Sequence, residues 1–475
     1  MLATLDPTSE QLEVIRLVRE TKDNLLINAL AGTGKTTTLE MIVASAKESP
    51  ILCLAFNKKI AEEMAKRFPC TCLVRTFNSL GHRIWAKTCV KNLTLDPKKV
   101  QAILGEMLKT MKKEDRREAS EAYWDIIHGV GYAKAVGYIP EGKFPSAKRL
   151  LERAPFFSSL EERPTAFIAS IIDEVLTESI KQAYDCLNDF NDQIYMPALF
   201  GGTFPRFPLV LIDEAQDLSP TNHALLHKLC KGRVIAVGDP WQSIYGFRGA
   251  LQHGMGQLQS HFTMHETTLS ISFRCPQRVV EEARWRVPSF KWTNIGGTVD
   301  HLPRLRPDDI CDDGVAIICR NNAPLFRCAF SLLSRGRSVS VAGSDIGPRV
   351  VGTMRKLADA SATRSDTLSH IQSWLDQKRD KGSTTADDMA ACMVIFAEHG
   401  QTLGQAIAYA EHLFAQRGSI RLLTGHKAKG LEFDTVYFLD PWLLGDDEQE
   451  LNLRYVIQTR AKRELYYINS KDIQW

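Results

Sequence analysis

The sequence contains no long hydrophobic run and no strong excess of charge of one sign. No apolar stretch approaches the ~20 residues that span a bilayer. The first residues, MLATLDPTSEQLEVIR, carry acidic side chains where a signal peptide has its apolar centre. We therefore expect a protein that is neither exported nor embedded in a membrane, located in the cytoplasm of a bacterial or phage-infected cell, or in the nucleus if its source is eukaryotic.

Metal-binding spacing is also missing among the eleven cysteines. The closest pair, Cys70 and Cys72, has C-x-C spacing, whereas zinc and iron–sulfur sites use C-x₂-C. This pattern predicts reduced, mostly buried thiols. The formal net charge of +3 does not by itself indicate nucleic-acid binding, so such a surface would have to be a local groove.

A chain of 475 residues with 44% hydrophobic residues predicts two to four domains. Short apolar strands, each followed by a helical pattern, recur along it and predict an α/β protein with parallel sheets covered by helices. The expected strands are Leu25–Asn28, Ile51–Phe56, Leu209–Ile212, Val234–Val237, Val315–Cys319 and Val436–Leu439.

Two long stretches interrupt this alternation. Residues from about Lys87 to Phe200 read as helices with charged faces and no strand alternation, and residues from Ile346 to Arg417 are again helical. Each α/β lobe is therefore expected to carry one helical insertion. The run Lys112–Glu118 has mixed signs, which favours a solvated helix face over a nucleic-acid contact.

The segment Leu30–Thr38, LAGTGKTTT, places a glycine-rich turn between an apolar strand and a helix. Such a turn can surround an anion with backbone N–H groups at the positive end of the helix dipole. Lys35 would reach the β- and γ-phosphates, and the Thr36 hydroxyl would bind Mg²⁺. Ala29 stands where the usual motif begins with glycine, and a purely structural turn is the alternative. The predicted nucleotide-binding residues are Ala31, Gly32, Thr33, Gly34, Lys35, Thr36 and Thr37.

A second acidic motif follows the strand Leu209–Ile212, where ligands bind in open α/β sheets. Asp213 would hold the Mg²⁺ that bridges the phosphates, and Glu214 would orient and deprotonate the attacking water. The alternative is a helix N-cap with an acidic first turn. The predicted metal ligands are Thr36 and Asp213, and the predicted cofactors are ATP and Mg²⁺.

Together with these two motifs, five further segments occur in the order found in superfamily-one helicases of the UvrD/Rep/PcrA type, and the chain resembles that family from Gln11 to Arg460. The segments are PTSEQ ending at Gln11, VGDPWQSIYGFRGA from Val237, SFR from Ser272, TGHKAKGLEF from Thr424 and NLRYVIQTRA from Asn452.

The resemblance implies a role for one or two residues in each segment. Gln11 would read adenine, Gln242 would sense the γ-phosphate, and Phe273 would lie near the adenine. Glu432 would meet the nucleotide sugar. Arg274 and Arg460 would stabilise the transferring phosphoryl group, since this transfer depends on charge neutralisation.

The family also implies two RecA-like P-loop NTPase lobes, each with an inserted, mainly helical subdomain. The expected division is 1–86 and 201–277 for the first lobe, 87–200 for its insertion, 278–345 and 418–475 for the second lobe, and 346–417 for a short second insertion.

Residues matching the single-strand groove of the family combine aromatic rings with polar groups, the usual means of gripping a strand. They are Phe56, Asn57, Thr76, Phe77, Tyr245, Phe247, Arg248 and His426. For each aromatic side chain, core packing is the alternative, above all for Phe77.

The implied activity is an ATP-dependent DNA helicase or translocase that moves 3′ to 5′ on single-stranded DNA and unwinds duplex in replication, recombination or repair. Its partners would be single-stranded DNA, strand junctions, and repair or replication proteins. A DNA-stimulated ATPase that remodels protein–DNA complexes with little unwinding shares every motif. The short second insertion leaves two alternatives open, a minimal unregulated helicase or a translocase that strips bound proteins. An RNA-directed motor has weaker support.

Overall fold

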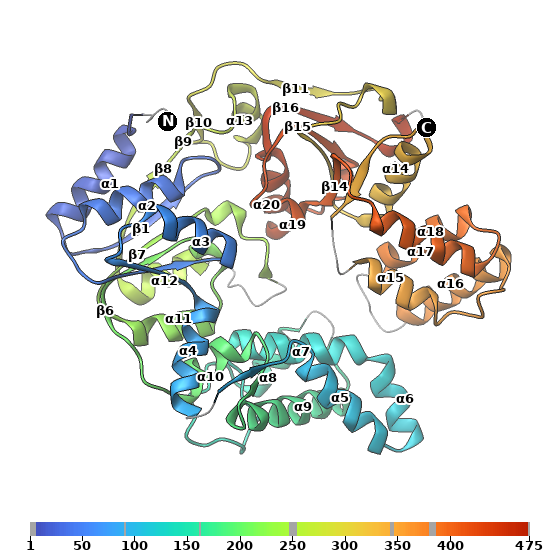
Figure 1. Cartoon of the computed structure of the whole chain (residues 1–475), viewed down its shortest axis with the longest axis horizontal. Helices are drawn as coiled ribbons and strands as arrows, with labels where there is room; N and C mark the ends of the chain where they lie inside the picture. Colours follow the sequence, from blue (N-terminus) through green and yellow to red (C-terminus); the bar gives the residue numbers. More distant parts are fainter. Residues whose placement is uncertain are drawn as a thin grey trace. The chain divides into compact units, whose positions relative to one another are not determined.

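The computed structural model describes residues 6–89, 92–160, 163–246, 254–342, 346–379 and 386–473. The chain divides into two compact units, Met1–Leu30 with Gly34–Leu269 and Ala31–Thr33 with Ser270–Trp475. Each unit contains one six-stranded parallel sheet flanked by helices (Figure 1). The α/β class and the two RecA-like lobes predicted from the sequence are confirmed.

The sheet of the first unit has the strand order β3-β2-β6-β7-β1-β8, and every neighbouring pair is parallel. Because all strands point the same way, their carboxyl ends meet at one edge of the sheet. The strands are β1 (Asn24–Ala29), β2 (Ile51–Ala55), β3 (Cys72–Thr76), β6 (Phe207–Ile212), β7 (Cys230–Gly238) and β8 (Met264–Leu269).

Side chains of these strands alternate between two separate hydrophobic cores. On β1, Leu25 and Ile27 join one core with residues of α1, α2 and α3, whereas Leu26 joins the other with residues of α4, α11 and α12. Both faces of the sheet are therefore covered, as parallel sheets require. These helices are α1 (Ser9–Glu20), α2 (Lys35–Ser45), α3 (Lys58–Arg67), α4 (Phe77–Cys89), α11 (Pro220–Leu229) and α12 (Gly254–Phe262).

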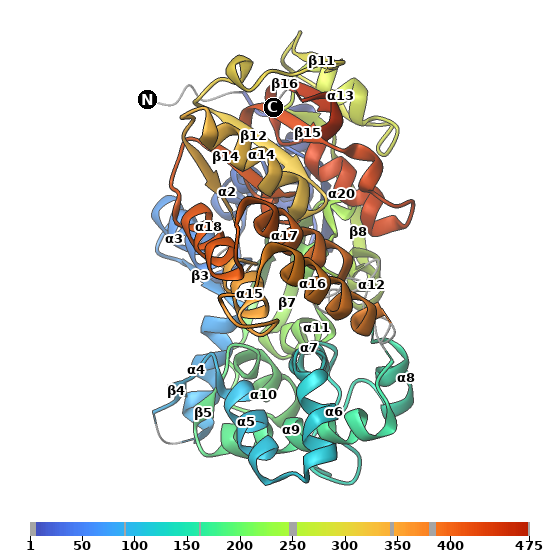
Figure 2. The same cartoon turned by 90° about the vertical axis from the view of Figure 1, so that its right-hand side faces the viewer.

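A mainly helical region lies between β3 and β6 and begins where α4 leaves the sheet. Its helices gather at the bottom of Figures 1 and 2. They are α5 (Lys99–Thr110), α6 (Lys113–Glu121), α7 (Tyr123–Val136), α8 (Arg153–Ser158), α9 (Ala166–Tyr184) and α10 (Asp192–Phe200). The helical interpretation of this region holds except for one short parallel pair, β4 (Thr94–Leu95) with β5 (Leu187–Asn188).

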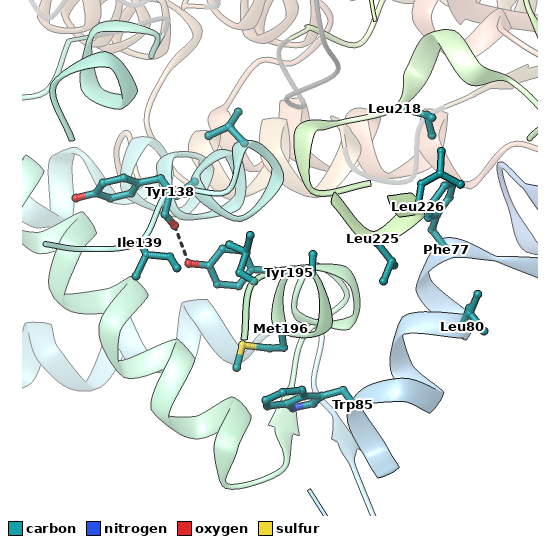
Figure 3. Close-up of a cluster of buried hydrophobic side chains, with 14 of the residues drawn as sticks. Phe77, Leu80, Trp85, Tyr138, Ile139, Tyr195, Met196, Leu218, Leu225 and Leu226 are labelled. Atoms are coloured by element: carbon teal, nitrogen blue, oxygen red, sulfur yellow. Dashed lines mark hydrogen bonds between the residues drawn. The ribbon is translucent and has the colours of Figure 1, made fainter. Parts of the chain in front are cut away.

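The helical region shares one hydrophobic core with the sheet (Figure 3). Trp85 of α4 lies near Met196 of α10, and the Tyr195 hydroxyl donates a hydrogen bond to the Tyr138 carbonyl at 2.6 Å. On the sheet side, Leu226 of α11 packs in the same cluster. Burial of these large side chains fixes the region against the first sheet.

Four charged side chains are buried in the middle of this region. The Lys134 ammonium lies 2.6 Å from an Asp189 oxygen and 2.7 Å from an Asp192 oxygen, and Lys99 lies 2.7 Å from Asp192. Their side chains are between 0% and 9% exposed. Such a group is stable only while every charge keeps its partner.

The second unit has the strand order β11-β16-β15-β12-β14-β13, again all parallel. The strands are β11 (Thr298–His301), β12 (Val315–Cys319), β13 (Val339–Val341), β14 (Ile420–Thr424), β15 (Phe433–Leu439) and β16 (Ala461–Ile468). A short parallel pair, β9 (Ile271–Ser272) and β10 (Lys291–Trp292), precedes them. Further helices of this unit are α13 (Gln277–Ala283), α14 (Asn322–Ser334), α19 (Gly425–Ala428) and α20 (Glu448–Gln458).

Four helices lie between β13 and β14 and pack side by side in both views (Figures 1 and 2). They are α15 (Ile346–Met354), α16 (Arg364–Arg379), α17 (Ala386–His399) and α18 (Leu403–Ala415). Their apolar side chains join those of α14 and of one face of the sheet in a single core. This second helical region is therefore continuous with its sheet rather than separately folded.

The six strands expected from the apolar runs are all present, within a few residues of their predicted ends. The charged run after Lys112 forms α6, an exposed helix in which Ala119 is the buried residue. All eleven cysteines are free thiols and seven are buried. Within the described ranges, the helices are too short or too polar to cross a bilayer.

Candidate nucleotide and DNA site

The phosphate loop joins β1 to α2 in the first unit. Gly32 and Gly34 have φ angles of +72° and +80°, a left-handed conformation that side chains with a Cβ rarely adopt. Lys35 is the first residue of the 11-residue helix α2. The loop thus directs the N-terminus of a helix toward the space above β1, the arrangement that binds phosphate.

Gln11 is fixed beside this loop. Its side chain is 3% exposed and closes a capping box with Thr8, because Oε1 accepts the Thr8 backbone N–H at 3.0 Å. Nε2 donates to Thr38 Oγ1 at 3.0 Å, and that hydroxyl donates to the Gly34 carbonyl at 3.0 Å. The amide of Gln11 therefore has one set orientation at the start of α2.

The acidic pair follows β6. Asp213 is 5% exposed, and Glu214 has a left-handed φ of +51°. The Gln216 amide donates to Glu214 at 2.5 Å and so holds the Glu214 carboxylate. The pKa of Asp213 is raised to about 7, mainly by burial and also by the Glu214 charge, while the Lys35 charge opposes this rise. These opposing effects show that Lys35, Asp213 and Glu214 lie within electrostatic reach of one another.

A third buried acid, Asp239, follows β7 and was given no role by the sequence analysis. It is fully buried, and its Oδ2 accepts the Gln242 amide at 2.7 Å. Its backbone N–H donates to Gln216 Oε1 at 2.9 Å. Because β7 lies between β6 and β1, its carboxyl end must open onto the same edge as the phosphate loop. That position in the sheet was the signal that could have identified Asp239.

The Lys35 charge acts on two buried carboxylates of this cluster. Burial raises the pKa of Asp239, while the Lys35 charge and the Gln242 hydrogen bond lower it. Lys35 likewise lowers the pKa of Asp213, which Glu214 raises, so the edge of the sheet places acidic side chains beside the phosphate loop. Among the described residues, no three His, Cys, Asp or Glu side chains converge as a metal site. Mg²⁺ fits such a place, since it is usually held by one or two protein oxygens plus phosphate oxygens.

The second unit holds the two predicted finger arginines. Arg274 forms an ion pair with Glu432, with Nη2 2.7 Å from Oε1, while its Nε is buried without a hydrogen-bond partner. Arg460 is 1% exposed, and its guanidinium donates to the carbonyls of Val456 and Leu431 at 2.9 and 3.3 Å. Both arginines are thus held by neighbours within their own unit.

Phe273, the predicted adenine neighbour, is half-buried beside Arg274. Its backbone N–H donates to the Gly32 carbonyl at 2.9 Å. His426, in α19, is also half-buried.

Two of the predicted DNA-binding aromatic residues face one another in the first unit. Phe56, at the end of β2, is 45% exposed, and its ring is parallel to that of Tyr245 within 9°, with centroids 6.3 Å apart. Asn57 caps α3 by accepting the Ile60 N–H at 2.9 Å, and Thr76 precedes α4. Both polar residues thus mark helix N-termini at the edge where the strands end, where phosphates are attracted.

Phe77 is different, because its side chain is 7% exposed and packs in the core of the first unit near Leu226 (Figure 3). As the first residue of α4, it turns inward with Leu80 and Trp85 on the same helix. No ring face is open for a base, so this residue follows the core-packing alternative. Phe247 and Arg248 lie outside the described residues.

Comparison with known proteins agrees with this geometry. The model of the UvrD/REP helicase N-terminal domain matches residues 8–263, and that of the UvrD-like helicase C-terminal domain matches residues 419–468.

Individual relatives carry helicase names. F-box DNA helicase protein 1 of Schizosaccharomyces pombe is 24% identical over 96% of this chain and 57% of its own length. F-box DNA helicase 1 of Gallus gallus is 25% identical over 97% of this chain and 49% of its own. DNA helicase IV of Escherichia coli is 29% identical over 56% and 45%. The chain spans about half the length of these relatives. By its motifs, its fold and these matches, the chain belongs to the UvrD/Rep helicase family.

Proposed function

We propose that this chain is an ATP-dependent DNA helicase that moves 3′ to 5′ along single-stranded DNA and separates duplex strands. The observation that carries the proposal is the clustering of Lys35, Asp213 and Gln242 at one edge of a parallel sheet, within a member of the UvrD/Rep family. The names of the relatives favour DNA over RNA as the nucleic acid along which the protein moves.

The loop Ala31–Thr37 cradles the phosphates and Lys35 neutralises them. The Thr36 hydroxyl and the Asp213 carboxylate would hold Mg²⁺, which would supply positive charge to the phosphate oxygens. Glu214 orients the attacking water and accepts its proton. Asp239, which we add to the site, holds the Gln242 amide toward the γ-phosphate.

In the second unit, Arg274 exchanges its ion pair with Glu432 for the transferring phosphoryl group, and Glu432 then meets the nucleotide sugar. Arg460 supplies the second positive charge. Because the phosphoryl transition state spreads charge over its oxygens, two added guanidinium groups accelerate hydrolysis strongly. Each cycle of hydrolysis would in this way be linked to a movement of the second unit.

Single-stranded DNA would stack a base on Phe56 and Tyr245, with phosphates near the helix N-termini at Asn57 and Thr76. The two rings lie parallel within 9°, with centroids 6.3 Å apart, so both offer aromatic surface to the same part of a strand. Phe247, Arg248 and His426 complete the proposed set of DNA contacts.

We further propose that residues 1–86 and 201–277 act as one motor lobe with 87–200 as its insertion. Residues 278–345 and 418–475 then act as the second lobe, with 346–417 as its insertion. The helical regions found between β3 and β6 and between β13 and β14 support the two insertions. The compact units divide at Leu269 and Ser270, so Arg274 groups with the second unit.

Strand separation on duplexes with a 3′ tail, a 5′ tail or no tail tests the proposal. Unwinding confined to the 3′-tailed duplex, with ATP and Mg²⁺, is the expected result. Lys35→Ala and Glu214→Gln should abolish DNA-stimulated hydrolysis. The control variant Lys109→Met, which removes an exposed ion pair with Glu106, should leave hydrolysis unchanged. Retained hydrolysis in Lys35→Ala would show that the site is wrongly assigned.

One observation favours a second function, the remodelling of protein–DNA complexes with little unwinding. The second helical region consists of the short helices α15 to α18, which pack on their own sheet. If single-stranded DNA stimulates hydrolysis but no duplex opens, this second function is the correct one.

A further inference from the structure

Two buried hydroxyl groups hold the backbone of the phosphate loop at Ala31. Residues Ala31–Thr33 group with the second unit by their contacts. Ser272 Oγ donates to the Ala31 carbonyl at 2.9 Å, and the Tyr455 hydroxyl accepts the Ala31 N–H at 3.3 Å. Ser272 and Tyr455 are both 0% exposed. Both backbone groups of Ala31 are therefore engaged by protein.

The position of Ser272 follows from the pairing of strands. The parallel ladder of β1 and β8 ends at Ala29 and Leu269 and continues as two hydrogen bonds, from Leu30 N to the Leu269 carbonyl at 3.0 Å and from Phe273 N to the Gly32 carbonyl at 2.9 Å. The chain after β8 thus runs directly beside the loop, and the Ser272 hydroxyl reaches it without a long side chain.

Gly32 shows how close this approach is. A Cβ at Gly32 would lie 2.5 Å from Arg274 Cβ and 2.7 Å from Ser272 Oγ, shorter than real Cβ atoms allow. The backbones must therefore meet at a residue without a side chain, and any shift of the 272–274 segment is transmitted to the loop.

Tyr455 connects the loop to Arg460 through the end of α20. The Tyr455 carbonyl accepts the Thr459 hydroxyl at 2.8 Å, and Thr459 Oγ1 accepts a hydrogen bond from Arg460 Nη2 at 3.2 Å. Cys275, whose N–H donates to Ser272 Oγ at 3.0 Å, also contacts the Thr459 carbonyl through its thiol at 3.6 Å. A continuous set of hydrogen bonds thus joins the loop, Ser272, Tyr455 and Arg460.

We propose that Ser272 and Tyr455 are positioning residues for the nucleotide, forming a clasp on Ala31. This inference rests on the proposed function. The clasp occupies the N–H and C=O of Ala31 and so fixes the backbone at the start of the loop. It also ties the loop to both finger arginines, since Ser272 precedes Arg274 by two residues and Tyr455 is bonded through Thr459 to Arg460.

Tyr455→Phe and Ser272→Ala test the clasp, with Tyr467→Phe as the matched control. Tyr467 is also buried, at 3% exposed, and its hydroxyl bonds Glu282 and Gln458 instead of the loop. We expect Tyr455→Phe to raise the KM for ATP about three- to tenfold, the effect of one lost buried hydrogen bond, and to weaken binding of a fluorescent ATP analogue equally. Tyr467→Phe should change both by less than about twofold, and Ser272→Thr, which keeps the hydroxyl, should bind ATP better than Ser272→Ala.

Amide hydrogen exchange of the loop peptide gives a readout independent of nucleotide. Tyr455→Phe should speed exchange in the peptide that contains Ala31, and Tyr467→Phe should not. Equal exchange in both variants, or equal KM values, would overturn the clasp. If the wild-type chain binds no ATP, the proposed function fails, and the exchange experiment alone still decides whether the clasp exists.

Discussion

Replacing Phe56 by alanine should weaken single-stranded DNA binding without disturbing the fold. The Phe56 ring is 45% exposed and lies parallel to Tyr245, so its removal opens no core cavity. Stacking on an aromatic ring contributes about 1–3 kcal/mol per base. Because Phe56 offers one face to a base that Tyr245 also contacts, the lower part of this range applies. We expect a loss of about 1–2 kcal/mol, which is roughly a 5- to 30-fold weaker Kd.

Fluorescence anisotropy with a labelled oligothymidylate, at one fixed salt concentration, measures this change. The matched control is Trp124→Ala, because Trp124 of α7 is also 45% exposed in the same unit. The salt dependence of binding should stay the same, since no phosphate contact is removed. Tyr245→Ala should weaken binding similarly, and the double variant should lose less than the sum, because both rings act on one base. A change below twofold in Phe56→Ala, or an equal change in Trp124→Ala, would refute the stacking argument.

Three further predictions concern stability and the loop. Lys134→Met should lower the free energy of unfolding by about 3–5 kcal/mol in chemical denaturation, because buried Asp189 loses its lysine partner and Asp192 keeps only Lys99, whereas the surface variant Lys109→Met should be nearly neutral. Burial lowers the pKa of His223 to about 4, next to His227 and His261, so the unfolded chain takes up a proton near pH 6.5 before the folded chain does. Stability should therefore fall by about 2 kcal/mol from pH 7 to pH 5, and His223→Asn should reduce that slope; an unchanged slope would contradict the assignment. Gly32→Ala should abolish ATP hydrolysis, whereas Gly336→Ala, with a similar φ of +73° but open space around it, should keep it.

The predicted strands were found because their signal is local. A run such as Leu209–Ile212 is buried on both faces, so its apolar character appears directly in the sequence. The edge strands β8 and β11 were harder to predict because they expose polar residues. The inner strand β16 was also missed, since exposed charged residues stand near its start. The two-residue strands β4 and β5 depend on pairing between distant segments and have no local signal.

The motifs around Lys35, Asp213 and Gln242 were recognisable because each combines particular residue types at fixed spacing next to a strand. The sequence did not indicate whether an individual aromatic ring faces solvent. Phe56 and Phe77 both follow strands and have polar neighbours in the sequence. Phe56 is exposed, whereas Phe77 is buried in the hydrophobic core of the first unit. The direction of a side chain at a helix start depends on what packs against that helix.

The sequence alone determined the family, the α/β class, the phosphate loop and the acidic motif, because backbone freedom at glycine and charge at strand ends are local properties. The tertiary structure alone decided which distant groups meet. The order β6-β7-β1 places Asp239 at the same edge as the phosphate loop, folding brings two lysines and two aspartates together in a core, and the ladder of β1 and β8 carries the Ser272 hydroxyl to Ala31. Each of these contacts joins residues far apart in the chain. Only packing and strand order determine which of these residues lie close together in space.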